Sequence, residues 1–366
     1  MKIRAAVLYA PGEPFRVEEV DLAEPRDGEV LVKVAAVGVC HSDWHLVTGD
    51  TQHPFPLVAG HEGAGFVSCS VSGSSVPRLN DGDLVALNWA PSCGTCFYCA
   101  EGRPALCGTY TDPIWAGTMI DGTTRLSLNG KPLYHYSALA CFAEYCIVPE
   151  QCCVKMSNDL DPEIAAVIGC AVATGVGSVL NTAKVRSGSS VVVIGAGGVG
   201  LSTIMGAKAA GASPIIAIDP LESRQQAALN MGADLAFPDA TQVRAKTNGR
   251  GADYVFEAVG KPALQETAVE IARPGGTVIF SGLSANGSAT NIPGARLVRE
   301  EKAVMGSYYG TCDAHRDFPL YAEMYQYGKL PLDRLVSHRY SLDQINEAYE
   351  DMLSGKSVRG VISFYD

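Results

Sequence analysis

Basic residues are scarce in this sequence of 366 residues, where 28 Lys and Arg stand against 39 Asp and Glu for a formal net charge of -11. No cluster of basic residues offsets that balance, which argues against the positive surface that a phosphate backbone requires. Long apolar runs are also lacking, because no stretch approaches the roughly 20 apolar residues that a membrane span needs. The apolar run within residues 1–10 is too short for the core of a signal peptide. We therefore expect no nucleic-acid partner and no membrane partner.

Internal repeats and low-complexity linkers are missing as well. What the sequence does contain is an ordinary globular composition, with 47% hydrophobic and 18% charged residues. A chain of this length is long enough for two domains, each with a sizeable core.

Four cysteines within fifteen residues give the densest chemical signal. Cys93, Cys96, Cys99 and Cys107 follow the spacing C-x2-C-x2-C-x7-C. Thiolates this close in sequence can converge on one tetrahedral ion, whereas so short a loop suits few disulfides. Four sulfur ligands leave a zinc ion no open position, so such a site stabilises a loop and performs no chemistry. We predict a structural zinc site; buried or disulfide-bonded cysteines are the alternative.

Cysteine usage elsewhere favours a reducing compartment. Of the twelve cysteines, four belong to this cluster, and Cys40 and Cys170 lie in motifs described below. The other six are scattered among apolar neighbours, where a free cysteine packs as a small hydrophobic side chain: Cys69, Cys141, Cys146, Cys152, Cys153 and Cys312. Because reduced, metal-binding thiols are typical of the cytosol, we expect a cytoplasmic protein.

The first part of the chain, to about residue 150, has the short strands and the Gly and Pro punctuation of a β-rich domain. Residues 28–38 form an apolar run bounded by glycines, and residues 81–88 follow a turn signal, so we expect a strand in each. Near the other end of the chain, residues 342–353 indicate a helix and residues 360–364 a strand.

From about residue 171 strand runs alternate with helical stretches. The expected strands are 190–194, 215–218, 254–256 and 277–280, and the expected helices are 199–210, 222–231 and 263–272. Strands separated by helices of this length predict a parallel, doubly wound α/β sheet.

The motif Gly195-Ala-Gly197-Gly-Val-Gly200 follows the first of these strands and opens a helix. A G-x-G-x-x-G sequence is weak evidence alone, but here Asp219 ends the next strand, as a dinucleotide site requires. The glycines let backbone N–H groups approach a pyrophosphate at a helix N-terminus. Asp219 can accept hydrogen bonds from ribose hydroxyls and would repel a 2′-phosphate, which favours NAD over NADP. Arg224 could contact the ribose or be a surface cation, and the motif could be a plain glycine turn beside a solvated Asp219.

Three further motifs complete a family pattern: Cys40-His-Ser-Asp-Trp-His45, Gly60-His61-Glu62 and Gly169-Cys170. With the four-cysteine cluster and the glycine loop, they resemble the zinc-dependent alcohol dehydrogenases of the medium-chain dehydrogenase/reductase superfamily, in the right order over essentially the whole chain. The resemblance implies an α/β protein with a GroES-like, β-rich catalytic domain at residues 1–170, completed by residues 311–366. Residues 171–310 would form a Rossmann coenzyme domain with a doubly wound parallel sheet.

The resemblance implies that Cys40, His61 and Cys170 bind a second, catalytic zinc ion. Ligand chemistry supports this, because two thiolates and one neutral imidazole give a zinc site of net charge near zero with its fourth position free. Asp43 matches a carboxylate that orients the ligand histidine, and Glu62 matches a residue behind the metal that can exchange as a transient ligand. Taken singly, His61 would be a core histidine and Cys170 a small buried side chain.

The resemblance also implies roles in proton transfer and coenzyme binding. Ser42 would accept the alcohol proton and His45 would deliver it to solvent, since a hydroxyl and an imidazole both donate and accept. His45 could instead be a simple surface residue. Four more positions match coenzyme contacts, although each could be packing or surface charge: His41 and Arg359 at the pyrophosphate, and Thr174 and Val199 at the nicotinamide ring.

The expected reaction is the reversible oxidation of a primary or aromatic alcohol to an aldehyde, with NAD as the hydride acceptor and two zinc ions per chain. Trp89, four residues before Cys93, matches an aromatic wall of the substrate pocket. The long connection 107–142 resembles the longer, dimeric members of the family, so we expect a homodimer.

Three other functions remain open. An S-(hydroxymethyl)glutathione (formaldehyde) dehydrogenase would carry an arginine shortly after the last cysteine of the cluster, where this chain has Gly108-Thr-Tyr-Thr111. A polyol dehydrogenase is disfavoured by Cys170, because many polyol enzymes have glutamate there. A non-catalytic, zinc-stabilised nucleotide-binding protein would share the cysteine cluster and the glycine loop, but would not need Cys40, His61, Cys170 and Ser42 together.

Overall fold

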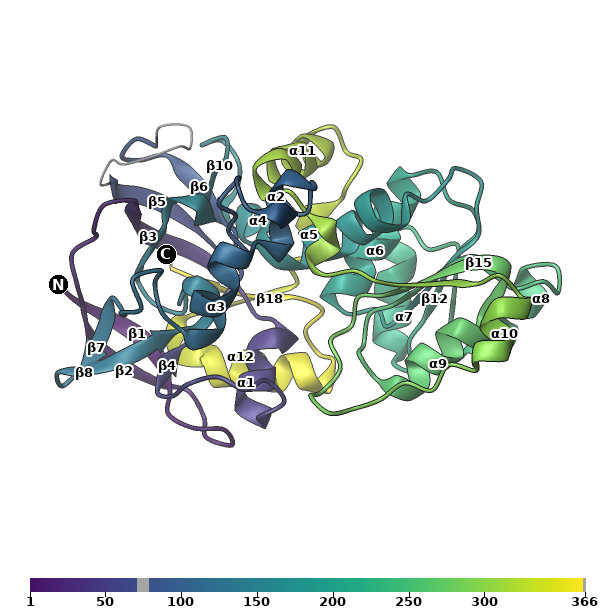
Figure 1. Cartoon of the computed structure of the whole chain (residues 1–366), viewed down its shortest axis with the longest axis horizontal. Coiled ribbons are helices and arrows are strands. Elements are labelled where there is room, and N and C mark those ends of the chain that lie inside the picture. The colour runs from purple at the N-terminus through teal and green to yellow at the C-terminus, as the bar shows by residue number, and fades with distance from the viewer. Residues whose placement is uncertain (71–78, 365–366) are drawn as a thin grey trace. The chain divides into compact units, whose positions relative to one another are not determined.

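The computed structural model describes residues 1–70 and 79–364, and the chain forms two compact units (Figure 1). The first unit consists of Met1–Cys170, Asp313–Glu323 and Val336–Asp366, and the second of Ala171–Cys312 and Met324–Leu335. The segment Met324–Leu335 therefore belongs to the second unit, although the sequence predicts residues 311–366 as part of the catalytic domain. Its contacts explain the difference, because Leu332 is fully buried and Arg334 donates a hydrogen bond to the backbone carbonyl of Asn230.

A small closed barrel forms part of the first unit. Its strands, in barrel order, are β1 (Lys2–Leu8), β2 (Arg16–Leu22), β7 (Leu126–Leu128), β8 (Lys131–His135) and β4 (Leu57–Val58). β1 and β2 are antiparallel, with Ile3 opposite Val20, and both side chains are buried in the barrel core. Alternation with period two places such apolar side chains on the inner face of a strand.

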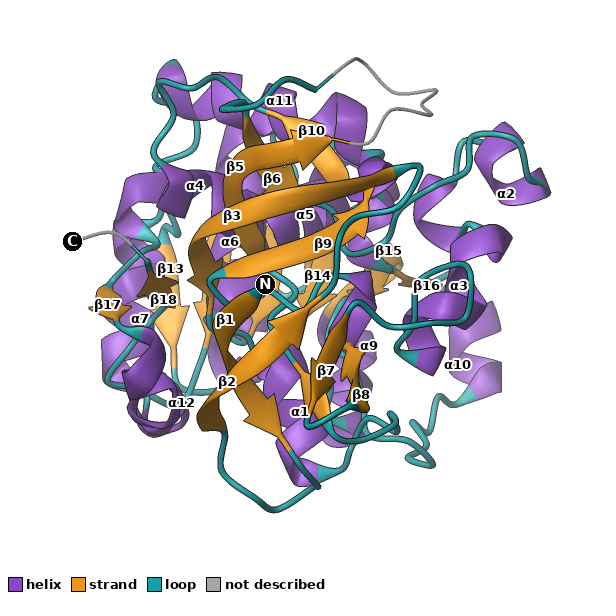
Figure 2. Cartoon of the chain, turned by 90° about the vertical axis from the view of Figure 1, so that its left-hand side faces the viewer, coloured by secondary structure: helices purple, strands orange, loops and turns teal. Residues whose placement is uncertain are grey.

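A seven-stranded sheet supplies most of the remaining β-structure of this unit (Figure 2). Its strand order is β10 (Cys153–Lys155), β6 (Leu84–Leu87), β5 (Gly63–Ser70), β3 (Glu29–Gly38), β18 (Gly360–Ser363) and β17 (His338–Tyr340), and β9 (Tyr145–Pro149) also pairs with β3. β3 is a central strand, because β5 pairs with one edge and β9 and β18 pair with the other, and its side chains are buried along most of its length. The strands expected within 28–38 and 360–364 are confirmed, and β6 occupies the middle of 81–88.

The first unit also carries six helices of more than one turn within the described residues. They are α1 (His41–Thr48), α2 (Phe97–Ala100), α3 (Gly108–Ala116), α4 (Pro162–Val167), α11 (Ala314–Gln326) and α12 (Ile345–Ser354). The last three residues of α11, from Met324, already belong to the second unit. α1 ends at Gly49, whose φ of 79° is the left-handed conformation common at helix C-termini. α12 confirms the helix expected near 342–353, and the side chains of Ser341 and Gln344 cap the short turn before it.

The second unit is a parallel sheet flanked by helices. Its strand order is β13 (Leu235–Phe237), β12 (Ile215–Ile218), β11 (Val191–Ile194), β14 (Ala252–Glu257), β15 (Ala272–Phe280) and β16 (Ala303–Gly306). Its helices are α5 (Ala173–Gly177), α6 (Gly198–Ala209), α7 (Glu222–Asn230), α8 (Val243–Lys246), α9 (Pro262–Ile271) and α10 (Gly294–Arg299). From β11 the chain builds outwards to one edge and then, through β14, to the other, which is the doubly wound arrangement that the sequence predicts.

One helical run corrects an expectation from the sequence. Pro162–Ala183 form a helix of 22 residues that is long and apolar enough to cross a bilayer. The prediction that the sequence has no apolar run of this length was therefore wrong. The most apolar part of this helix is 94% buried inside the protein, which explains its composition. Its glycines allow close packing, because a Cβ at Gly169 would lie only 2.8 Å from the carbonyl oxygen of Leu87.

Candidate functional site

Two thiols and an imidazole from distant parts of the sequence converge in the first unit. Cys40 directly precedes α1, His61 lies two residues before β5, and Cys170 lies in the helix that continues α4. Their ligand atoms all lie within 4.8 Å of one another, and His61 Nε2 is 3.2 Å from Cys170 Sγ. All three side chains are buried. Two sulfurs and one nitrogen form a donor set that suits zinc with one position left open.

Asp43 fixes the orientation of His61. Its Oδ2 lies 2.9 Å from His61 Nδ1, and its Oδ1 accepts a hydrogen bond of 2.9 Å from the backbone N–H of Gly60. With Nδ1 engaged by the carboxylate, the other ring nitrogen faces the sulfur of Cys170. Carboxylates hold metal-binding imidazoles in this way, and they select the tautomer that can ligate.

The electrostatics of this cluster favour a cation at its centre. A hydrogen bond with Cys170 lowers the pKa of Cys40 well below that of a free thiol, against the opposing effect of burial. Burial also lowers the pKa of His61, but Asp43 and Cys40 outweigh it and raise that pKa to about 10. A set of groups that stabilises thiolates and draws a proton onto its imidazole also attracts a metal ion. The residues present therefore fit zinc.

Glu62 and Arg359 form a buried ion pair next to this cluster. Arg359 Nη2 donates to Glu62 Oε2. Gly38, the last residue of β3, makes room for the carboxylate, because a Cβ at that position would overlap Glu62 Oε2. Pairing of β18 with β3 brings Arg359 to this place, since Gly360 accepts a hydrogen bond from the Val39 N–H. The structure thus gives Arg359 a partner that sequence reasoning missed, and its contact with a pyrophosphate stays a prediction.

The expected proton-relay residues lie on one short helix. Ser42 and His45 are three residues apart in α1, so they share a face of the helix, and both are partly exposed. The Ser42 Oγ lies 3.8 Å from Cys40 Sγ. His41, the first residue of α1, is exposed.

Two aromatic rings flank the imidazole of His61. Trp89, expected as a pocket wall, packs edge-on at 6.2 Å between ring centroids, and Tyr136 packs edge-on at 5.5 Å. The Tyr136 hydroxyl donates to the Ser42 carbonyl at 3.3 Å. Burial, together with the negative charges of Asp43 and the cysteines, raises the pKa of Tyr136 well above its usual value, so this phenol keeps its proton. Sequence reasoning missed Tyr136, because it belongs to no motif and lies far from His61 along the chain.

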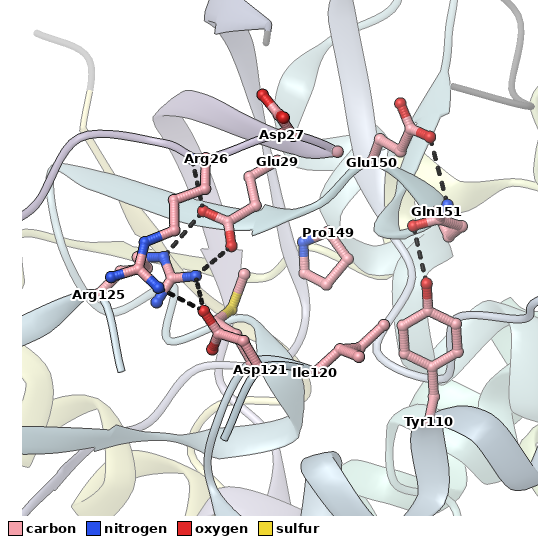
Figure 3. A pocket seen from close by; sticks show the side chains of 12 residues that line it. Arg26, Asp27, Glu29, Tyr110, Ile120, Asp121, Arg125, Pro149, Glu150 and Gln151 are labelled. Atoms are coloured by element: carbon pink, nitrogen blue, oxygen red, sulfur yellow. Dashed lines mark hydrogen bonds and ion pairs between the residues drawn. The ribbon is translucent and has the colours of Figure 1, made fainter. Parts of the chain in front are cut away.

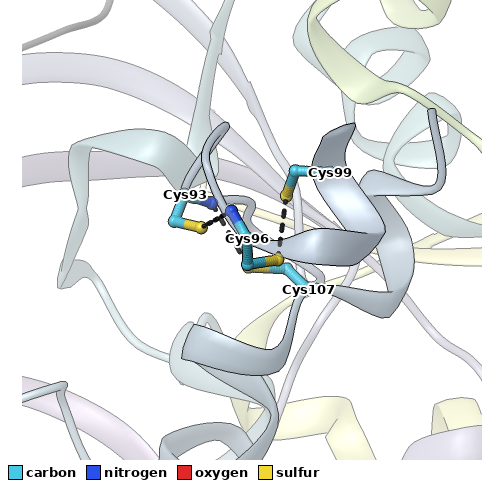
Figure 4. Close-up of side chains that lie close together, drawn as sticks. All are labelled: Cys93, Cys96, Cys99 and Cys107. Atoms are coloured by element: carbon cyan, nitrogen blue, oxygen red, sulfur yellow. Dashed lines mark hydrogen bonds between the residues drawn. The ribbon is translucent and has the colours of Figure 1, made fainter. Parts of the chain in front are cut away.

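The four-cysteine cluster has the geometry that its spacing predicts (Figure 4). The sulfurs of Cys93, Cys96, Cys99 and Cys107 all lie within 4.8 Å of one another. Backbone N–H groups donate to two of them, from Cys96 to Cys93 Sγ and from Cys93 to Cys107 Sγ, each at 3.3 Å. The Thr109 hydroxyl and nearby N–H groups lower the pKa of Cys93 to about 5. All twelve cysteines lie in the described residues and are free thiols, which fits a zinc ligand set and contradicts the disulfide alternative.

An open cleft of about 970 Å³ in the first unit has a mixed lining, whose polar side chains bond to one another (Figure 3). The guanidinium of Arg125 donates to both carboxylate oxygens of Glu29, at 2.8 and 2.5 Å, and to Asp121 at 2.8 Å. On the other side of the cleft, the Tyr110 hydroxyl donates to the Gln151 side chain at 2.8 Å. We therefore assign these groups a structural role.

The glycine loop of the second unit has the backbone that its motif requires. Gly195 has a φ of 93°, which a residue with a side chain rarely adopts. A Cβ at Gly200 would overlap the carbonyl oxygen of Gly195, so only glycine fits there. Gly197 directly precedes α6, and residues 197–199 are partly exposed. The N-terminus of α6 is thus open to an anionic group such as a pyrophosphate.

Asp219 lies directly after β12 and faces this loop. Its Oδ2 accepts a hydrogen bond of 2.9 Å from the backbone N–H of Ala196, and its Oδ1 accepts one of 3.0 Å from Leu221. Each carboxylate oxygen keeps a lone pair for a ribose hydroxyl. Arg224 Nη1 lies 3.9 Å from the same carboxylate, so this arginine faces Asp219 and is not an isolated surface cation.

Thr174 and Val199 come from helices that pack closely. Thr174 lies in α5 and Val199 in the first turn of α6. Gly175 permits the contact, because a Cβ there would lie 2.5 Å from the carbonyl oxygen of Val199. Their expected contacts with a nicotinamide ring remain a prediction.

Both units match known families. Residues 26–158 match the alcohol dehydrogenase GroES-like domain, and residues 198–326 match the zinc-binding dehydrogenase family. The chain therefore belongs to the zinc-binding medium-chain alcohol dehydrogenases, as the motifs of the sequence indicate. The fold is confirmed with the family, as a GroES-like domain with a small barrel and a Rossmann-like domain with a six-stranded parallel sheet.

Individual relatives differ in the substrates that their names describe. The NDMA-dependent alcohol dehydrogenase of Amycolatopsis methanolica is 39% identical over 369 residues, covering 99% of both chains. The S-(hydroxymethyl)glutathione dehydrogenase of Escherichia coli is 38% identical over 372 residues, covering 100% of both. The crystal structure of benzyl alcohol dehydrogenase from Acinetobacter calcoaceticus superposes with a TM-score of 0.93 at 31% identity, covering 100% of both chains. Similarity alone therefore does not select the substrate.

Proposed function

We propose that this protein is an NAD-dependent zinc enzyme that reversibly oxidises primary or aromatic alcohols to aldehydes. The observation that carries the proposal is the buried set of Cys40, His61 and Cys170, with Asp43 holding the far nitrogen of the imidazole. A zinc ion bound by this set would supply a Lewis acid, which makes an alcohol hydroxyl acidic enough to lose its proton near neutral pH. Neither a purely structural zinc site nor a nucleotide-binding protein without catalysis needs this second, three-ligand set.

The residues around the zinc ligands handle the proton. Ser42, whose Oγ lies 3.8 Å from Cys40 Sγ, accepts it, and His45 on the same face of α1 releases it to solvent. The protonated Tyr136 holds the backbone carbonyl of Ser42 and thereby fixes the start of α1. The Arg359–Glu62 pair balances the charge of the Glu62 carboxylate, which would otherwise be buried alone.

The nucleotide loop supports NAD as the hydride acceptor. Asp219 accepts a hydrogen bond from the N–H of Ala196 in the glycine loop. In this proposal its carboxylate also accepts hydrogen bonds from two ribose hydroxyls and repels a 2′-phosphate. Arg224 beside it would contact the ribose edge. Further coenzyme contacts in this proposal are His41 and Arg359 at the pyrophosphate and Thr174 and Val199 at the nicotinamide.

An aromatic wall favours an apolar or aromatic alcohol over a glutathione adduct. Trp89 and Tyr136 both pack against His61, and neither brings a charge to the site. The first turn of α3, Gly108–Thr111, has no basic residue to hold a glutathione carboxylate. The similarity to a benzyl alcohol dehydrogenase agrees with this choice, whereas the glutathione-dependent relative from Escherichia coli makes the adduct the second candidate.

The test is a panel of substrates followed by NADH absorbance. Ethanol, benzyl alcohol and a polyol are assayed with NAD and with NADP, each with and without glutathione plus formaldehyde. We expect turnover of benzyl alcohol with NAD in the absence of glutathione. Strict dependence on glutathione, or equal rates with NADP, would contradict the proposal.

We also propose a cytoplasmic homodimer. The twelve free cysteines support a reducing compartment. The long connection between Cys107 and Phe142 supports the dimer, and light scattering of the purified protein would test it by giving the mass of two chains.

A further inference from the structure

Glu257 is a buried carboxylate at the carboxyl end of an inner strand of the parallel sheet, at the same end as the nucleotide loop. It is the last residue of β14 and is fully buried. In the sheet register it lies beside Ile194 of β11 on one side and Phe280 of β15 on the other. Gly195, the first glycine of the loop, directly follows Ile194. Glu257 thus lies on the strand next to the one that leads into the loop. Both are at the carboxyl ends of the strands, where nucleotides bind in such folds.

This one residue joins the turns that follow two neighbouring strands. Its Oε1 accepts hydrogen bonds from the backbone N–H groups of Val259 and Gly260, each at 2.8 Å. Its backbone carbonyl accepts two more, from Ser281 at 2.8 Å and Gly282 at 2.9 Å. Four backbone N–H groups from two turns therefore end on Glu257.

The turns held in this way press directly against the glycine loop. A Cβ at Gly282 would overlap the backbone nitrogen of Gly260, so these two turns are in backbone contact. A Cβ at Gly195 would lie 2.5 Å from Cγ2 of Val259, so the Val259 side chain covers that glycine. Val259 is 39% exposed. Because Val259 lies in the turn after β14, a shift of this turn would change its contact with Gly195.

Asp253, at the other end of β14, is a structural carboxylate whose charge partner can be compared with the surroundings of Glu257. Asp253 also accepts backbone and hydroxyl hydrogen bonds, from Ser190, but it is paired with Arg273 at 2.5 Å. Burial opposes its ionisation, yet Ser190 and Arg273 prevail and lower the pKa of Asp253 to about 2. Glu257 forms no ion pair with any residue that the structure describes. Burial raises its pKa, although hydrogen bonds from the N–H groups of Val259 and Gly260 and from the Gln265 side chain oppose this effect. A buried carboxylate with a shifted pKa is a candidate for a functional role.

We propose that Glu257 is a positioning residue for the dinucleotide, and that it acts by holding Val259 across Gly195 at the loop that receives the coenzyme. The inference rests on the proposed function, because it requires that the second unit binds NAD. It assigns Glu257 no contact with the reacting atoms.

The test compares NAD affinity in matched variants of the full-length, zinc-loaded protein. We expect Glu257→Ala to raise the dissociation constant for NAD by about tenfold or more, and Glu257→Gln, whose amide oxygen can accept the same two N–H bonds, to stay within about threefold of the wild type. The KM for NAD should rise in Glu257→Ala while kcat at saturating NAD and the KM for the alcohol change little. Asp253→Ala is the control at the opposite end of β14, and it should lower Tm with little effect on NAD affinity.

A second variant tests the contact with the glycine loop without removing a buried group. Val259→Ala removes a partly exposed side chain, so it should fold normally and still weaken NAD binding several-fold. Unchanged NAD affinity in Val259→Ala, or an equal loss in Asp253→Ala and Glu257→Ala, would overturn the inference. Absence of NAD binding in the wild type would instead contradict the proposed function itself, and the inference with it.

Discussion

Among the buried carboxylates that accept a backbone N–H bond, three lie at or near the proposed functional sites. Asp43 accepts a hydrogen bond from the N–H of Gly60, and its second oxygen faces His61, a proposed zinc ligand. Asp219 binds the N–H of Ala196 beside the glycine loop. Glu257 binds two N–H groups in the turn that covers the same loop. In each case one part of the carboxylate holds the backbone, so the side chain has a fixed direction when it meets its functional partner.

The candidate metal ligands and Asp43, which lies within a family motif, were predictable from the sequence, whereas supporting residues outside the motifs were not. The candidate ligands Cys40, His61 and Cys170 were predictable because thiols and imidazoles in family motifs carry a chemical meaning of their own. Tyr136 and Glu257 could not be found in this way, since a tyrosine or glutamate is common and gains its role only from the neighbours that the fold provides.

The coenzyme preference is tested at Asp219. Replacing it by alanine removes both the acceptor for the ribose hydroxyls and the charge that repels a 2′-phosphate. We expect the KM for NAD to rise by roughly tenfold or more, because a hydrogen bond to a charged group contributes about 1.5–3 kcal/mol, and we expect the preference for NAD over NADP to narrow. Steady-state kinetics with both coenzymes gives the answer, and an unchanged ratio of kcat/KM values would show that Asp219 does not select the coenzyme.

At the scale of elements, the candidate metal sites lie where short connections begin or end. Cys40 directly precedes α1, and the four-cysteine cluster brackets α2 and directly precedes α3. Short helices such as α2 have too few internal hydrogen bonds to be stable alone. A zinc ion bound by the cluster would replace the missing apolar core of this segment.

The structural role of the cluster predicts the effect of removing one ligand. Cys96→Ala should lower the zinc content by about one ion per chain and the Tm by roughly 10 °C, because the loop would lose its cross-link. Zinc analysis and calorimetry measure both quantities. Cys69→Ser, at an exposed thiol outside both sets, is the control and should change neither. Retention of all zinc with an unaltered Tm in Cys96→Ala would contradict the assignment.

The barrel contains a histidine that makes stability depend on pH. His135, in β8, is fully buried and accepts a hydrogen bond from the Arg125 N–H. Burial, with added repulsion from Arg125 and His53, lowers its pKa to about 4. In the unfolded chain this histidine has a pKa of about 6.5. Below about pH 6.5 this histidine binds a proton in the unfolded state but stays neutral in the folded state. The free energy of unfolding therefore falls as the pH drops from about 6.5 to about 4, by up to roughly 3 kcal/mol.

Urea unfolding of the wild type and of His135→Gln between about pH 4 and about pH 6.5 measures how much His135 contributes to the pH dependence of the unfolding free energy. Glutamine keeps a hydrogen-bond acceptor for the Arg125 N–H but takes up no proton. The difference in unfolding free energy between the two proteins should therefore shift in favour of the variant as the pH falls. A constant difference over the whole range would show that His135 is not responsible.

Regular elements were easier to predict than irregular ones. In the second unit the strands β11, β12, β14 and β15 lie at the expected places, because buried parallel strands are continuous apolar runs. The helix Pro162–Ala183 was missed, since it is buried all round and therefore lacks the polar face that marks a surface helix.

At the scale of the whole molecule, the chain combines a unit with two metal-ligand sets and a unit with a nucleotide loop. The first unit alone contains Cys40, His61 and Cys170, and the second alone contains Gly195 and Asp219. Loss of a catalytic zinc ligand should therefore leave nucleotide binding intact. The assignment of Met324–Leu335 to the second unit was not predictable. It depends on packing, such as the complete burial of Leu332, and not on any motif.

The most direct test of the catalytic zinc is the rate of NADH formation from benzyl alcohol by Cys40→Ala, in protein that still binds NAD as tightly as the wild type. We expect this rate to fall by about a thousandfold or more, because the alcohol would lose the Lewis acid that acidifies its hydroxyl. A rate within about tenfold of the wild type, or about 1.4 kcal/mol in activation free energy, would contradict it.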